Sequence, residues 1–181
     1  HAEHKVGFIR QYIFSTDHKM IGRQFLFFGL FNTISGGLMA LMVRWELAWP
    51  ETQLPGTGWI PEPYMVDRYM TPAFYNQLFT MHATIMIFFA VMPILIGAFG
   101  NFLIPLMIGA RDMAFPTLNM LSFWVGVLAA IIMFASFLVP GGAAGAGWTS
   151  YTPLSDIIQN ADGTLNNPSG VDWGQNLWCI S

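Results

Sequence analysis

A histidine inside a long apolar segment is the residue of this chain best placed to do chemistry. His82 is the only His, Asp, Glu, Lys or Arg within residues 69–110, and its neighbours Ala83 and Met86 are small or apolar. An ionisable side chain is costly inside a bilayer and usually marks a functional site. Because neutral imidazole binds heme iron well, His82 is either a heme ligand or a core histidine hydrogen-bonded to a neighbouring helix.

A second group of polar side chains surrounds a short connection between two apolar segments. Asp112 opens the later segment, Asn101 lies eleven residues before it, and Asn119 lies seven residues after it. In helices these spacings are about three turns and about two turns, so the amides can share a face with the carboxylate. A carboxylate at the mouth, amides deeper in and bridging water are what a proton entrance requires. Alternatively, Asp112 simply caps the helix that follows.

Arg44 ends the first apolar segment. If the first two apolar segments form antiparallel helices, Arg44 and His82 lie at similar depths, with His82 about one turn inside the end of its helix. Arg44 then either pairs with a heme substituent and stabilises charge near the iron, or snorkels from the interface to water.

The composition is that of a membrane protein. Apolar residues make up 54% of the chain and charged residues only 9%, whereas a soluble domain has about 25% charged residues. Three stretches contain the ~20 mostly apolar residues that a helix needs to cross a bilayer, and they lack the alternation of barrel strands. We expect an all-α, polytopic transmembrane bundle that forms one membrane-embedded unit over residues 1–181. The expected helices are at about 20–43, 76–107 and 115–139, with the start of a fourth at about 175–181 and outer loops at 44–75 and 140–174.

The distribution of positive charge predicts the orientation in the membrane. The first 23 residues carry four Lys or Arg and the second connection carries Arg111, whereas residues 140–175 carry none. The positive-inside rule therefore places the N-terminus and Arg111 on the cytoplasmic side. The single cysteine, Cys179, excludes an intrachain disulfide, and no basic patch indicates nucleic-acid binding.

Several ordered motifs together resemble subunit I of the heme–copper oxidases. They lie before the first span, along the second span, at the second-to-third junction and in the following outer loop. In order they are Ser15–Lys19 with Ile21-Gly22, His82 with Met86–Phe89 and Met92-Pro93, Gly100-Asn101, Pro105, Ile108–Pro116, Leu118-Asn119, Ser122–Trp124, Gly147–Thr149, Tyr151 and Pro153–Ser155. The similarity extends to Ser181, with a poor fit in residues 49–71 and 157–173.

The resemblance implies a role for each matched position. His82 would be one of two axial ligands of a low-spin heme, and Arg44 would lie beside a substituent of that heme. Asp112, Asn101 and Asn119 would form the entrance of a proton channel. The remaining matches are Trp148 and Tyr151 near the heme–copper centre, and Glu46 and Gln53 at a structural cation site.

The resemblance also implies cofactors and partners beyond these residues. The low-spin heme would be heme A, and a second heme and copper would be bound by later parts of a twelve-helix subunit. We expect the remainder of subunit I, a copper-bearing subunit II, subunit III, cytochrome c and the lipid bilayer as partners, in a respiratory membrane such as a bacterial plasma membrane. The missing helices suggest that the sequence is a truncated record of a longer chain rather than one piece of a split subunit.

The resemblance favours oxygen reduction to water with electrons from cytochrome c and with proton uptake and pumping. Quinol-oxidising relatives carry a His-x-x-Gln pair before the heme ligand, but this chain has Phe74 before Gln77. The charged quinol-associated positions of the first span correspond to about Ser35 and Met39. The alternatives are a quinol oxidase, a non-redox transporter, for which we see no inverted repeat, and a simple heme-b electron carrier.

Overall fold

The computed structural model describes residues 7–50, 52–58, 60, 64–139, 141–150 and 173–181. The described elements are almost all helices, and three of them are long and apolar enough to cross a membrane: His18–Ala48, Pro72–Ile108 and Pro116–Leu138. This confirms the predicted class, an all-α bundle of transmembrane helices.

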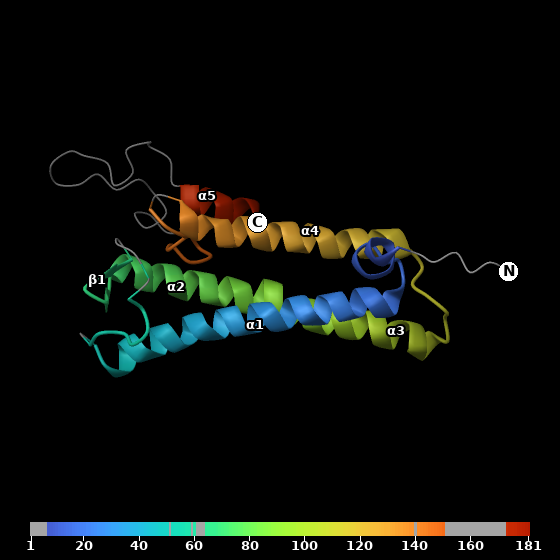
Figure 1. Cartoon of the computed structure of the whole chain (residues 1–181), viewed down its shortest axis with the longest axis horizontal. Coiled ribbons are helices and arrows are strands. Elements are labelled where there is room, and N and C mark those ends of the chain that lie inside the picture. Colours follow the sequence, from blue (N-terminus) through green and yellow to red (C-terminus); the bar gives the residue numbers. More distant parts are fainter. Residues whose placement is uncertain (1–6, 51, 59, 61–63, 140, 151–172) are drawn as a thin grey trace. The chain divides into compact units, whose positions relative to one another are not determined.

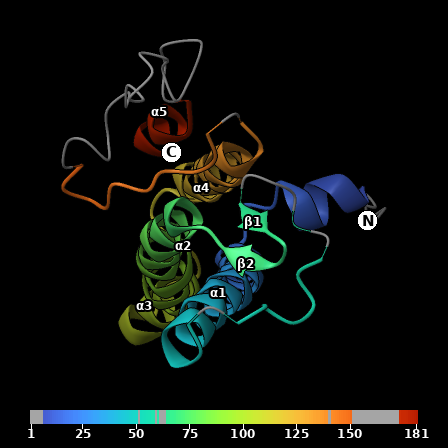
Figure 2. The ribbon, with the colours of Figure 1, turned by 90° about the vertical axis from the view of Figure 1, so that its left-hand side faces the viewer.

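The first span is a single helix, α1 (His18–Ala48), preceded by a short π-helix, η1 (Ile9–Ile13). The third span consists of α4 (Pro116–Ala135) and a 3-10 turn, η4 (Ser136–Leu138), and the last described helix is α5 (Trp173–Ile180). Between the first two spans, β1 (Met65–Val66) and β2 (Tyr69–Met70) form an antiparallel hairpin (Figure 2).

The second span combines several kinds of helix that follow one another along the chain. It runs through α2 (Pro72–Thr84), the π-helices η2 (Ile85–Val91) and η3 (Pro93–Phe99), and α3 (Gly100–Ile108). Pro93 has no N–H, and its ring disturbs the preceding turn, which is a common cause of local widening. The span ends at Gly109, whose φ of 69° places it in the left-handed region that favours glycine at a helix C-terminus.

The start of the second span and the place of Asp112 differ from the sequence prediction. The Thr71 hydroxyl accepts a hydrogen bond from the Phe74 N–H, and Pro72 opens α2, so this helix begins earlier than expected. His82 is therefore ten residues, or almost three turns, inside the helix rather than one. In the third span, Pro116 opens α4, so Asp112 lies in the preceding connection and does not cap the helix.

The chain divides into two compact units, and each is described separately. The first contains residues 1–33 and 87–128, and the second contains residues 34–86 and 129–181. In the first unit the N-terminal half of α1 lies beside α3, and in the second unit its C-terminal half lies beside α2 (Figure 1).

Aromatic rings fill the interior of the first unit. The Phe123 ring lies edge-on to the rings of Phe25 and Phe28, with centroid distances of 5.1 and 6.0 Å. Trp124 stacks against Phe14 and donates a hydrogen bond to the Ile13 carbonyl at 3.2 Å, which fixes η1 to α4. The second unit instead has an apolar cluster built from Leu54, Met65, Phe74 and Leu78.

Candidate functional site

His82 is held in a defined orientation within the second unit. It lies half-buried on α2, and its Nδ1 is 2.9 Å from the carbonyl oxygen of Gly36 on α1. When Nδ1 carries the hydrogen and donates it to this carbonyl, Nε2 keeps its lone pair. Metal-binding histidines commonly have their other ring nitrogen hydrogen-bonded in this way, because the bond sets the tautomer and the ring orientation.

The two helices approach each other closely at position 36, where a glycine stands. A Cβ at Gly36 would lie 2.8 Å from the Met86 Sδ and 3.3 Å from a methyl carbon of Ile85. Such contacts are too short for an unshifted side chain. The missing side chain therefore brings the Gly36 carbonyl within hydrogen-bonding distance of His82.

The surroundings of His82 fit a flat, apolar cofactor. Gly37 follows Gly36 on α1, and, within the described residues, no heavy atom outside its own chain neighbours and the adjoining backbone of α1 lies within 4 Å of the place where its Cβ would be. Ala83, the next residue on α2, is small as well. A free Nε2 next to small residues is the donor arrangement that an axial heme ligand needs.

The opposite face of α2 anchors α5 and the described segment that follows the third span, residues 141–150. Thr80 and Thr84 are each two residues from His82, about 200° around the helix. The Thr80 hydroxyl accepts a hydrogen bond from the Gly147 N–H at 3.1 Å. The Thr84 hydroxyl accepts one from Trp148 Nε1 and another from Trp178 Nε1, both at 3.1 Å. Trp148 is therefore held on the face of α2 that points away from His82.

We predict that Thr84→Val destabilises the assembled protein by about 1–3 kcal/mol, because the two indole N–H groups lose their shared acceptor. Thr33→Val is the matched control, since among the described residues the Thr33 hydroxyl bonds only to the Gly29 carbonyl of its own helix. This variant should change stability by less than about 0.5 kcal/mol. Thermal denaturation of the assembled complex measures both. Equal effects of the two variants would contradict the anchoring role of Thr84.

The other predicted residues of the second unit lie away from His82. Arg44 is exposed on α1, eight residues after Gly36, which is about 12 Å along the helix axis. Gln53 Oε1 accepts a hydrogen bond from Arg68, which competes with a cation for that oxygen. Glu46 lies half-buried near the end of α1. The cation site at Glu46 and Gln53 stays a prediction, and Tyr151 lies outside the described residues.

Tyr64 also ties the hairpin loop to the end of the third span. Its hydroxyl donates a hydrogen bond to the Phe137 carbonyl at 2.5 Å. Burial raises the pKa of Tyr64 above its ordinary value, so the hydroxyl keeps its hydrogen across the physiological pH range.

Asp112 pairs with a histidine in the first unit. Its Oδ1 lies 3.1 Å from Nδ1 of His18, the first residue of α1, and it accepts a hydrogen bond from the Met113 N–H at 2.8 Å. His18 is buried at 4% exposure, whereas the Asp112 side chain is 42% exposed. Asp112 thus places one carboxylate at the surface in contact with a titratable ring that points into the protein.

Asn101 and Asn119 meet in the interior of the same unit. The Asn119 Nδ2 donates to the Asn101 Oδ1 at 2.5 Å, and the Asn101 Nδ2 donates to the Gly97 carbonyl at 2.6 Å. Asn101 is almost fully buried. The structure therefore brings the predicted polar group together as two pairs, Asp112 with His18 and Asn101 with Asn119.

The sequence interpretation missed three residues that orient these sites. His18 stands at the start of the first span within a motif already noted, but nothing local indicates that it reaches Asp112. Gly36 is one of two adjacent glycines in the first span, and Thr84 follows His82 by two residues. Glycine pairs and threonines are common in spans, so their types alone carry no functional signal.

Comparison with known proteins decides the family. The model of the family "Cytochrome C and Quinol oxidase polypeptide I" matches residues 20–181. The chain belongs to this family. Cytochrome c oxidase subunit 1 of Thermostichus vulcanus is 47% identical over 146 residues, which cover 81% of this chain and 23% of the relative. The subunits of the same name from Mytilus edulis and Corynebacterium efficiens are each 42% identical, over 81% and 92% of this chain.

Membership in the oxidase polypeptide I family agrees with the arrangement at His82 described above, in which a free Nε2 lies next to small residues. The chain spans about a quarter of the length of the curated relatives that it matches, 23% and 24% in the three cases. Heme and copper are expected in this family, as are other subunits in a membrane-bound complex.

Proposed function

We propose that the chain is the N-terminal part of the catalytic subunit of a terminal oxidase. The enzyme would transfer electrons from cytochrome c by way of a low-spin heme to a heme–copper centre, reduce oxygen to water, and take up and pump protons. The observation that carries the proposal is the orientation of His82, whose Nδ1 faces the Gly36 carbonyl at 2.9 Å and whose Nε2 remains free.

On the electron-transfer side, the residues of this chain hold and tune the cofactor. His82 Nε2 would be one axial ligand of the low-spin heme, which we assign as heme A and which supplies reversible one-electron chemistry when bound. The Gly36 carbonyl raises the basicity of the imidazole through Nδ1. Arg44 would lie beside a ring substituent, and Trp148 with Tyr151 would pack near the heme–copper centre. The second axial ligand and the copper ligands would come from later parts of the subunit.

On the proton side, Asp112 would accept protons at the surface, with His18 orienting its carboxylate. The Asn101–Asn119 pair would continue the polar path inward through bound water. Support for this assignment comes from the exposed Asp112 carboxylate and from the buried Asn101 amide, both in the first unit.

The proposed setting is a respiratory membrane, with a bacterial plasma membrane as the specific assignment. The distribution of Lys and Arg supports placing the N-terminus and Arg111 on the cytoplasmic side. The proposed partners are the remainder of subunit I, a copper-bearing subunit II, subunit III and cytochrome c.

The residues at the quinol-associated positions favour cytochrome c as the electron donor. Ser35, Met39 and Phe74 line a cavity of about 960 Å³ in the second unit, and no lining side chain carries a charge at neutral pH. Gln77 is buried and donates one of its two amide hydrogens to the Gly141 carbonyl at 2.9 Å, and its side chain carries no charge. A quinol headgroup would find space there but no charged partner.

A turnover assay on the whole complex tests this proposal. Oxygen consumption is measured with reduced cytochrome c and, separately, with a reduced ubiquinol or menaquinol analogue. We expect turnover with cytochrome c alone. Turnover with quinol alone would contradict the proposal and favour the quinol-oxidising alternative. A purified complex without heme absorbance would favour a non-redox transporter, although the family membership argues against that class.

A further inference from the structure

The cavity of about 960 Å³ in the second unit has the length of one leaflet of a membrane. Along α1 its wall runs from Ser35 to Trp45, which is ten residues or about 15 Å of helix. One leaflet is half of a hydrocarbon core that is about 30 Å thick. The cavity therefore follows a membrane-spanning helix over the depth of one leaflet and stops close to the last residue of that helix, Ala48.

The wall of the cavity is mostly apolar. Its lining includes Met39 and Met42 of α1, Leu78 of α2 and Phe137 of η4. Methionine side chains are flexible and adapt to the shape of an apolar ligand. Apolar cavities in proteins stay dry and take up apolar molecules instead of water. Hydrocarbon is therefore a suitable occupant of this cavity, and water is not.

The cavity is accessible from the side of the helices. Leu41 of α1 and Leu138 of η4 both line it, and they are 66% and 87% exposed within the described part of the chain. In a bilayer, such side chains meet lipid tails. The hydrocarbon chain of a membrane lipid can therefore enter the cavity sideways without passing through water.

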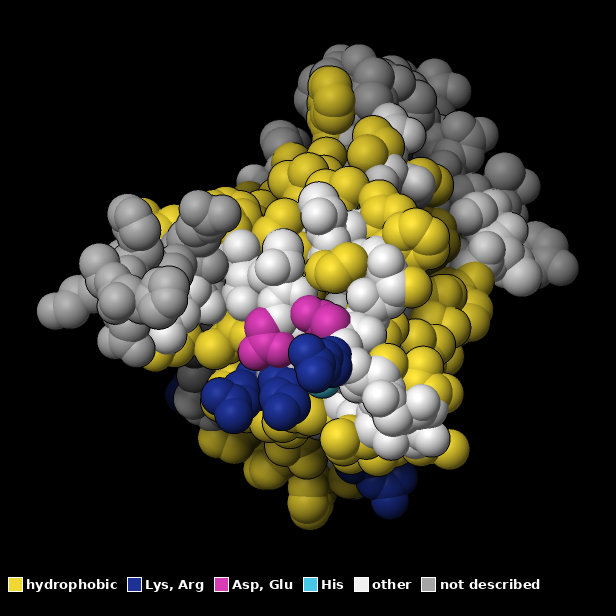
Figure 3. All heavy atoms as spheres, turned by 90° about the vertical axis from the view of Figure 1, so that its right-hand side faces the viewer, with side chains coloured by type: hydrophobic (Ala, Val, Ile, Leu, Met, Phe, Trp, Pro, Cys, Tyr) yellow, Lys and Arg dark blue, Asp and Glu magenta, His cyan; other side chains and the backbone are white. Residues whose placement is uncertain are grey.

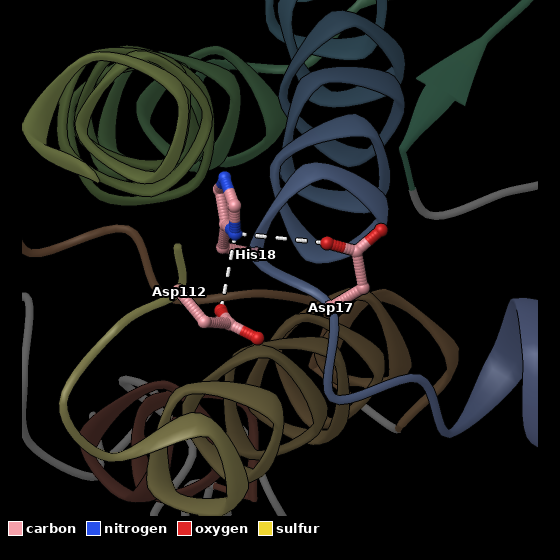
Figure 4. Close-up of side chains that lie close together, drawn as sticks. All are labelled: Asp17, His18 and Asp112. Atoms are coloured by element: carbon pink, nitrogen blue, oxygen red, sulfur yellow. Dashed lines mark hydrogen bonds and ion pairs between the residues drawn. The ribbon is translucent and has the colours of Figure 1, made fainter. Parts of the chain in front are cut away.

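Charged side chains are concentrated elsewhere in the chain. Asp17, His18 and Asp112 belong to the first unit, where the His18 Nδ1 lies 3.1 Å from the Asp112 Oδ1 (Figure 4). Lysine and arginine side chains gather beside acidic ones on the face shown in Figure 3. None of the described residues that line the cavity carries a charge at neutral pH. A charged headgroup would therefore stay outside the cavity, while its apolar chain enters.

One hydrogen-bond donor lies where the cavity approaches the end of α1. Trp45 lines the cavity, and its Nε1 is buried and has no hydrogen-bond partner among the described residues. A buried donor without an acceptor is unfavourable. Tryptophan is enriched at membrane interfaces, because its ring is apolar and its N–H is polar. The ester carbonyl of a glycerolipid would supply the missing acceptor at this depth.

We propose that the cavity binds one acyl chain of a glycerophospholipid, whose ester carbonyl accepts a hydrogen bond from the Trp45 Nε1. The chain fills the space between α1, α2 and η4, and the headgroup lies beyond Trp45. This binding site does not depend on the electron donor or on the proton path proposed above, so it is tested by binding alone.

The test uses the whole oxidase complex in liposomes of phosphatidylglycerol that carries a diazirine in one acyl chain. After illumination, mass spectrometry locates the lipid adducts, which we expect on residues 38–42 and 137–139. Met39→Trp should reduce this labelling by about tenfold or more, because displacing two buried methylenes already weakens binding that much. Ile34→Trp is the matched control, since Ile34 is 65% exposed on α1 and is not among the described lining residues.

A second pair of variants tests the polar contact without adding bulk. Trp45→Phe keeps an aromatic ring but removes the N–H, and it should lower the labelling by about fivefold, the effect of one hydrogen bond. Trp49→Phe is its control, because Trp49 is 54% exposed and packs on the Trp45 ring at a centroid distance of 4.7 Å. Labelling in this control should match the wild type. The heme spectrum of each variant reports assembly, and if Met39→Trp does not assemble, the Trp45 pair decides.

Three outcomes would overturn the proposal. The first is an absence of adducts on the cavity wall, which would mean that the remainder of the complex covers it. The second is equal labelling of each variant and its control. The third is a quinone that copurifies at one per complex and is lost in Met39→Trp, because the occupant would then be a quinone and not a phospholipid.

Discussion

Replacing His82 by alanine should remove the low-spin heme band from the reduced-minus-oxidised spectrum of the whole complex. The substitution deletes the imidazole whose Nε2 would bind the heme iron. Among the described residues of the second span, no other histidine is present to replace it. Electron delivery to the heme–copper centre would stop, so oxygen consumption should fall by far more than the tenfold typical of an outer-shell change. An intact low-spin band in His82→Ala would falsify the ligand assignment.

Alanine substitutions at two neighbouring glycines distinguish a specific effect on the His82 ring from general damage to α1. Gly36→Ala places a methyl group 2.8 Å from the Met86 Sδ, which pushes α1 away and lengthens the bond between the Gly36 carbonyl and His82. We expect heme binding to weaken by about tenfold, with a shifted low-spin band. Gly37→Ala is the matched control, because no described heavy atom outside its own chain neighbours and the adjoining backbone of α1 lies within 4 Å of its Cβ position. Indistinguishable spectra of the two variants would argue against control of the ring by Gly36.

Asp112→Asn should slow proton uptake while both hemes remain in place. The amide keeps the shape of the carboxylate and can still interact with His18, but it cannot take up a proton near neutral pH. Loss of a positioned proton-transfer group typically costs about 10²-fold or more in the step that it serves. Proton uptake by the complex in liposomes, followed with a pH-sensitive dye during oxygen reduction, measures this step.

Two controls distinguish a proton path from a structural role for Asp112. Asp67→Asn removes one exposed carboxylate from the hairpin, and proton uptake should stay close to the wild-type rate. The heme spectrum of Asp112→Asn should match that of the wild type. Lost heme bands in Asp112→Asn would mean that the His18–Asp112 contact stabilises the fold instead of guiding protons.

Each span could be predicted from the sequence because its signal is local. About twenty apolar residues in a row meet the length requirement of a bilayer, whatever the rest of the chain does. The helix starts were harder to predict, because they depend on single residues. Thr71 with Pro72 starts α2 before the apolar run begins, and Pro116 excludes Asp112 from α4.

The partners of the site residues could not be predicted in the same way. His82 is separated from Gly36 by 46 residues, and His18 from Asp112 by 94. A contact over such a distance depends on which faces of two helices pack together, and several registers satisfy the same apolar pattern. Spacing along one helix therefore did not reveal that Asp112 lies next to His18 and that Asn101 lies next to Asn119.

The sequence alone determined the class of the protein, the approximate spans and the unusual position of His82, because hydropathy and residue type are properties of short segments. Only the tertiary structure decided how that histidine is used. The close approach at Gly36 occupies Nδ1 and leaves Nε2 free, and the hydrogen bond to Thr84 holds Trp148 on the opposite face of α2. The physical reason is that a ring tautomer and a helix face are set by atoms from distant segments, which meet only when the helices pack.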